Sequence, residues 1–207
     1  CNGDCLSTGF SNVIIGNKNV HQSVLTGCCN VVLGQLAGAS LTSGNTNVFI
    51  GKESGKNFSP GSANIVIGPA ACLAGTATGS ANIILGQYTA RCLNSGASHN
   101  IALGEYALGS MNNTSIEGSH NIAIGYIALP NVNDGQLNIG LGKCAGQATT
   151  DGCNNIFLGC YSGKNVTTGS RNIAIGKNTD VGSATGNDQL VIGCGASSWI
   201  AGDSSFN

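Results

Sequence analysis

A five-residue unit recurs along nearly the whole chain and constrains its fold more than any other feature. Each unit begins with Asn, continues with three mostly apolar residues and ends with Gly, and the eleventh unit has Gln in place of Asn. The steps between successive units are 18, 17, 17, 18, 18, 21, 17, 17, 17 and 17 residues. The units begin at Asn12, Asn30, Asn47, Asn64, Asn82, Asn100, Asn121, Asn138, Asn155, Asn172 and Gln189. A fixed period of this length is typical of solenoids, in which each unit stacks on its neighbours.

Each unit predicts one short strand, because three apolar residues are followed by a Gly that can adopt the backbone angles of a turn. Stacked parallel strands advance by about 4.8 Å per coil. The sequence therefore predicts an all-β fold, a parallel β-solenoid (a β-roll or β-helix) of about 11 coils of 17 or 18 residues. We expect residues 1–207 to form a single repeat domain, with repeat units from 12 to 193 and ends that continue or cap the array. The 21-residue step contains residues 111–115, which we expect to form an outward loop.

The three apolar residues of each unit form three parallel rows when the units are stacked. The first and third residues, here called the flanking rows, are always Val, Ile or Leu, whereas the second residue, the middle row, varies in size. Because side chains alternate along a strand, the uniform flanking rows predict the interior, and the middle row then points outward. An outward row without charged or hydrogen-bonding side chains is an apolar stripe that monomers rarely expose, so we expect a subunit interface there. The middle row consists of Ile14, Val32, Phe49, Val66, Ile84, Ala102, Ala123, Gly140, Phe157, Ala174 and Val191.

The Asn and Gln residues that open the units, here called the ladder row, predict a second regular feature. A side-chain amide carries both donors and acceptors. Amides stacked at one corner of successive coils can therefore pair along the axis of the solenoid. The sequence predicts a structural ladder of all eleven of these side chains.

The unit Asn-Ile-Ala-Ile-Gly, present at residues 121–125 and 172–176, resembles the repeat in the head domains of YadA-like trimeric autotransporter adhesins. It is also similar to the Asn-Thr-Ala-Ile-Gly-type repeats of phage tail-fibre proteins. The resemblance extends over residues 12–193 and implies a parallel β-roll or β-helix in a homotrimer. It also implies that alternate apolar positions pack inside or between subunits, and that the protein is displayed at the end or along the shaft of a surface fibre.

We therefore expect a structural and adhesive segment of a viral tail fibre or cell-surface filament, extracellular and on the surface of a virion or cell. Its expected partners are further copies of the chain, in a trimer or longer fibre, and a host-surface glycan or protein receptor. The alternative is an ice-binding or carbohydrate-binding β-solenoid. The carboxylates are scattered over different coil positions, so we expect no catalytic residues and no enzyme.

Composition excludes several other functions. Eight Lys and Arg residues and a net charge of −1 argue against nucleic-acid binding, which needs clustered positive charge. No apolar run approaches the roughly 18 residues of a membrane span, so we expect no membrane insertion. No cofactor is expected.

The ten cysteines and three histidines are the remaining residues that could carry chemistry. Cys144 with Cys160, and Cys72 with Cys92, fall at similar positions in adjacent coils, so each pair could form a disulfide if the side chains face each other. Small buried thiols with one to three disulfides are the favoured interpretation. His99 and His120 precede consecutive ladder residues and could stack about 5 Å apart. Either they hold a metal ion or, as we favour, they are two exposed polar side chains, so we expect no metal site.

Overall fold

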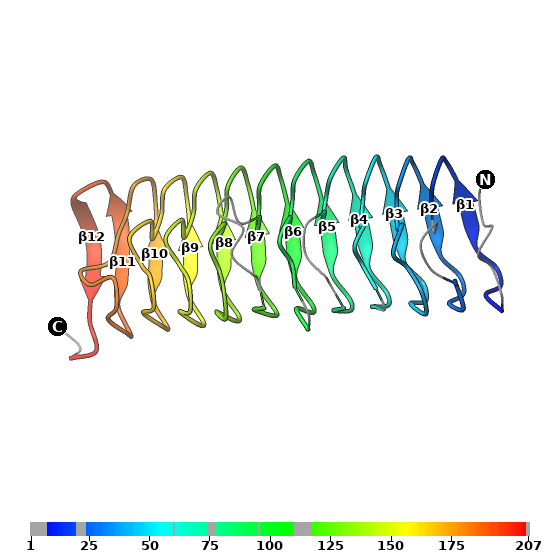
Figure 1. Ribbon diagram of the computed structural model, residues 1–207. Helices are drawn as coiled ribbons and strands as arrows, with labels where there is room; N and C mark the ends of the chain where they lie inside the picture. Colours follow the sequence, from blue (N-terminus) through cyan, green and yellow to red (C-terminus); the bar gives the residue numbers. More distant parts are fainter. Residues whose placement is uncertain are drawn as a thin grey trace.

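The structure, a computed structural model, describes residues 8–19, 24–59, 61–73, 78–94, 96–109 and 117–205, and these residues form strands and turns without a helix. The coils stack into a rod with the two chain ends at opposite ends (Figure 1). The strands are β1 (Val13–Ile15), β2 (Val31–Leu33), β3 (Val48–Ile50), β4 (Ile65–Ile67), β5 (Ile83–Leu85), β6 (Ile101–Leu103), β7 (Ile122–Ile124), β8 (Ile139–Leu141), β9 (Ile156–Leu158), β10 (Ile173–Ile175), β11 (Leu190–Cys194) and β12 (Ser197–Gly202).

The strands form one sheet in sequence order, and β1 to β11 are parallel and in register. This confirms the parallel β-solenoid with one strand per unit. The eleven parallel strands enclose about ten turns, slightly fewer than the 11 coils expected. The difference arises because the chain after β11 turns back, and β12 pairs with β11 in the antiparallel direction instead of closing another coil.

The Gly that ends each unit is required by both the turn and the stacking. Gly34, directly after β2, has a φ of +133°, a conformation that side chains disfavour. A Cβ atom at this position would lie 2.5 Å from the carbonyl oxygen of Gly51 in the next coil. Each three-residue strand therefore ends where the backbones of adjacent coils approach too closely for any side chain.

The middle row lies inside the coils, so the prediction that it points outward as a subunit interface is wrong. Its side chains are fully buried from β2 to β10 and half-buried in β1 and β11, within a single chain. The predicted alternation is correct, but the parity is reversed, because the buried ladder residue and the middle row lie two positions apart on the same side of the strand. The flanking rows therefore point outward.

The core is narrow, and its side chains compensate for one another in size. Phe49 of the middle row lies against Gly38 and Gly55, where added Cβ atoms would come within 2.8 and 2.9 Å of its ring. Where the middle row narrows to Gly140, the space is taken by Leu129, whose Cγ atom would lie 2.7 Å from a Cβ atom at residue 140. This packing explains why the middle row varies between Gly and Phe while the flanking rows do not.

The 21-residue step leaves the solenoid in register. β6 and β7 pair through Ile101 and Ile122, as in the shorter steps. The backbone N–H of Asn121 donates to Oδ1 of Asn100 at 2.9 Å, so the ladder also crosses this step. The expected loop at residues 111–115 lies outside the described residues.

Candidate functional site

One face of the rod is a flat strip of aliphatic side chains formed by the two flanking rows. Each strand from β1 to β11 contributes its first and third residues, which are Val, Ile or Leu in every case. The most exposed are Ile15 at 61%, Val13 at 49% and Leu141 at 44%, and the others remain partly exposed. No charged or polar side chain interrupts either row. We call this surface the apolar face.

The apolar face continues onto β12. Ile200 pairs with Ile192 of β11 and is 54% exposed, so it extends one flanking row by a further strand. Trp199, beside it, is exposed as well. The face therefore runs along the whole sheet, over a length of about 50 Å at the usual spacing of strands.

The ladder row forms a continuous chain of buried amides. In the middle of the rod, Oδ1 of Asn138 accepts hydrogen bonds from the backbone N–H and the side-chain amide of Asn155, both at 3.0 Å. Nδ2 of Asn155 also donates to the carbonyl oxygen of Gly169 at 2.9 Å, which ties the corner of the coil to its neighbour. Gln189 continues the pattern by donating to Asn172. The ladder stabilises the coils, and the buried amides from Asn30 to Gln189 are not available to a ligand.

A second ladder, which the sequence interpretation missed, lies two residues before the first. There a backbone N–H donates to the side chain of the equivalent residue in the next coil. The acceptors are Asn45, Ser62, Ser80, Ser98, Ser119, Cys153, Ser170 and Asn187. The recurrence of Ser and Asn two residues before the ladder row is the sequence pattern that could have predicted this second ladder.

His99 and His120 are brought together as expected. Their ring centroids are 4.8 Å apart and the ring planes differ by 4°, and both side chains are exposed. Each residue has a left-handed backbone, with φ of +60° and +61°. Their backbone N–H groups donate to the carbonyl oxygens of Ser80 and Ser98, each at 3.0 Å. Backbone hydrogen bonds therefore fix the positions of the two residues, and the rings stack on each other.

The predicted disulfides are not formed among the residues that the structure describes. The 17-residue step places Tyr161, not Cys160, over Cys144, and the Tyr161 hydroxyl and the Cys144 thiol form a hydrogen bond that raises the pKa of Tyr161. Cys72 is fully buried, and its 18-residue step leads to Ala90, two positions short of Cys92. Burial, and to a smaller extent the nearby Cys92, raise the pKa of Cys72 to about 12.

All four tyrosines contact an aromatic ring or a cation in an adjacent coil. Tyr88 and Tyr106 stack with their centroids 5.3 Å apart and are half-buried. Nζ of Lys143 lies 5.8 Å from the ring centroid of Tyr126 and 6.0 Å from that of Tyr161. These contacts connect adjacent coils, and each ring packs against a neighbouring side chain.

Charged side chains are sparse, and the described residues form two ion pairs, Lys56 with Glu53 and Arg171 with Asp188. Nε of Arg171 lies 2.6 Å from Oδ1 of Asp188, and hydrogen bonding to Arg171 lowers the pKa of Asp188. The described residues contain no group of three or more His, Cys, Asp or Glu side chains that could hold a metal ion. Within the same residues, no helix has the length and apolar character needed to cross a membrane.

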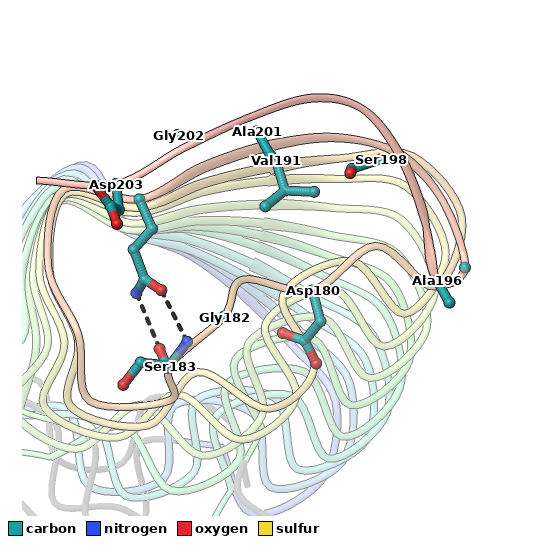
Figure 2. Close-up of a pocket in the computed structure, with 11 residues that line it drawn as sticks. Asp180, Gly182, Ser183, Val191, Ala196, Ser198, Ala201, Gly202 and Asp203 are labelled. Atoms are coloured by element: carbon teal, nitrogen blue, oxygen red, sulfur yellow. Dashed lines mark hydrogen bonds between the residues drawn. The ribbon is translucent and has the colours of Figure 1, made fainter. Parts of the chain in front are cut away.

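A cavity of about 670 Å³ lies at the C-terminal end of the interior, between β11, β12 and residues 180–183 (Figure 2). Val191 and Ala201 supply apolar lining, and the side chain of Gln189 forms two hydrogen bonds with the backbone of Ser183. Burial raises the pKa of the half-buried Asp180, although the N–H groups of Asn165 and Val181 donate to its carboxylate. The cavity is the end of the core, where the reversal of β12 leaves the last coil uncovered.

No family model, no curated protein and no solved structure matches the chain.

Proposed function

We propose that the protein is a structural fibre segment, a rigid rod that associates with further copies of itself through the apolar face. The observation that carries this proposal is the unbroken pair of aliphatic rows along β1 to β11, whose members are exposed or partly exposed in the isolated chain. A monomer rarely keeps such a large apolar patch in contact with water. The middle row is buried within the chain and is not available for an interface. The apolar surface that a partner would cover is formed by the flanking rows.

The dimensions of the apolar face favour a protein partner. The face is three residues wide and ten strand spacings long, which gives a projected area of about 500 Å². Stable interfaces bury roughly 800 Å² per partner, which is of the same order once the adjoining side chains are included. The face is therefore large enough to support a lasting contact between subunits.

The regularity of the face favours a second copy of the same chain as that partner. Its side chains repeat at the strand spacing without interruption, and the surface that matches this spacing over the full length is another such sheet. Its lack of charge excludes a partner recognised by ion pairs. By resemblance to adhesin heads and tail fibres, we propose that three copies associate around the apolar faces. The assembly then serves outside the cell as a viral or cell-surface fibre that contributes to attachment.

The mass in solution, measured by light scattering with and without reductant, tests the proposal. We expect about three times 20.6 kDa under both conditions, because the described cysteines form no disulfides. Ile83→Glu should convert the assembly to monomers, because each interface would bury an unpaired carboxylate. The dissociation constant should rise by at least about 100-fold, a change of about 2.8 kcal/mol.

The matched control is Gln87→Glu, which adds the same charge in the same coil at an exposed residue off the apolar face. Its mass should equal that of the wild type. The circular dichroism of both variants should keep its β-sheet form. A wild-type monomer, or an Ile83→Glu protein of unchanged mass, would contradict self-association, and the apolar face would then be a candidate for ordering water or binding carbohydrate.

A further inference from the structure

We propose that His99 and His120 form a two-point binding site for a borderline divalent transition-metal ion, with Zn²⁺ as its representative. The two imidazoles are stacked on adjacent coils, 4.8 Å between centroids, and are exposed to solvent. Imidazole nitrogen is a preferred ligand for Zn²⁺, Cu²⁺ and Ni²⁺. The site lies beside the apolar face and does not depend on the function proposed above.

The backbone holds both ligands before any metal binds. Each histidine directly precedes a ladder residue, and the N–H of Asn121 donates to Asn100 at 2.9 Å, which fixes the spacing of the two coils. Two further backbone hydrogen bonds hold the histidines themselves, to Ser80 and Ser98. Binding therefore requires no rearrangement of the backbone, and its cost is the reorientation and fixing of two side chains.

Binding of one ion by both rings requires them to leave the stacked arrangement. With Zn–N bonds of about 2.0–2.1 Å, two nitrogens of a tetrahedral ion lie roughly 3.4 Å apart. A ring nitrogen coordinates along its lone pair, which lies in the plane of the ring, and the near-parallel planes of the stacked rings do not meet at a common ion. Both side chains must therefore rotate until the two ring planes converge on one ion, and their exposure leaves space for that movement. Two protein ligands leave two positions for water or for a donor group from another molecule, in agreement with the lack of a third His, Cys, Asp or Glu among the described neighbours.

The test uses the full chain labelled at its histidine rings. The sequence has three histidines, so the ring spectrum contains three signals, and His21, outside the described residues, is an internal reference. Exposed thiols are alkylated beforehand because they also bind Zn²⁺. During a Zn²⁺ titration, the signals of His99 and His120 should shift together with one midpoint, and His21 should shift only at a much higher concentration.

The variants His99→Asn and His120→Asn separate two-point from single-ligand binding. Asn tolerates the left-handed backbone of both positions, as Asn154 does at the equivalent position of a later coil. Each variant should weaken Zn²⁺ binding at the remaining histidine by about 100-fold, since the second contact acts at a high effective concentration. His21→Asn should leave Zn²⁺ binding at His99 and at His120 unchanged. Separate midpoints for His99 and His120 in the wild type, or losses below about 3-fold in the single variants, would overturn the site.

Discussion

At the scale of residues, the fold is stabilised by neutral side-chain amides that are buried away from solvent. The ladder side chains from Asn30 to Gln189 are almost completely buried, and those from Asn30 to Asn172 both donate and accept between coils. Burial of a polar group is costly unless its hydrogen bonds are satisfied. The ladder satisfies them by repetition, because each amide presents the same groups to the next coil.

Asn155→Ala tests the contribution of one ladder residue. The substitution removes the hydrogen bonds of Asn155 to Asn138 and Gly169, and it leaves the backbone N–H of Asn172 without its acceptor. We expect the free energy of unfolding to fall by about 3 kcal/mol, measured by urea denaturation, because buried groups lose their partners. The control Asn165→Ala changes an exposed Asn and should cost less than about 0.5 kcal/mol. Equal losses in the two variants would show that the ladder adds no stability.

The orientation of the strands is the part of the residue-level structure that the sequence interpretation reversed. Both sets of strand residues are apolar, so hydrophobicity alone does not distinguish inside from outside. The distinguishing signal was variation in size. Phe49 requires Gly38 and Gly55, and Gly140 requires Leu129, which is the signature of a packed interior. The uniform flanking rows have no such partners within the chain.

At the scale of elements, the repeat predicted the strands, their order and their register, because each strand is defined by residues within its own unit. Features that depend on how the residues of adjacent coils align were harder to predict from the sequence. Cys144 and Cys160 were expected to meet, but an offset of one residue placed Tyr161 over Cys144. The reversal of β12 was also missed, because no repeat unit describes it. The stacking of His99 and His120 was predicted correctly, since both occupy the same position in their units.

Deletion of residues 111–114 tests the autonomy of the coils, because it shortens the 21-residue step to the 17 residues of its neighbours. β6 and β7 are already in register across this step, so no strand has to shift. We expect the Tm to change by less than about 3 °C, since a change of four residues in the length of the connection between two strands has a small entropic effect. The comparison is deletion of residues 147–150, which shortens a 17-residue step and removes the buried Thr149. This second deletion should abolish cooperative unfolding, and similar Tm values for both would contradict the defined coil length.

At the scale of the whole molecule, the rod is stabilised with few charges. The pKa values of two carboxylates, Asp188 and Asp180, are shifted in opposite directions. The lowered pKa of Asp188 contributes stability that is lost as the pH falls, whereas the raised pKa of Asp180 favours its protonated form and therefore low pH. Both act in the acidic range. Between pH 5 and 8, the repeated hydrogen bonds and the core involve groups that do not titrate.

The alkaline range is different because of Cys72. The folded chain keeps this buried thiol neutral up to about pH 12, whereas an unfolded chain releases the proton near its ordinary pKa of 9.0. Between these values the unfolded state binds fewer protons, so the free energy of unfolding must fall as the pH rises. For one thiol the slope is at most about 1.4 kcal/mol per pH unit. Thermal or urea unfolding in reductant should therefore give constant stability from pH 6 to 8 and a decline above pH 9.

Cys72→Ala should remove most of this decline, whatever its effect on stability at neutral pH. Cys194→Ala is the control, because Cys194 is exposed and its loss should leave the slope unchanged. The comparison concerns slopes and is therefore insensitive to the cavity that the smaller side chain leaves. A decline of equal slope in the Cys72→Ala protein would contradict this assignment. The decline would then arise from other groups whose pKa is raised in the folded chain, such as Cys92 and Tyr161.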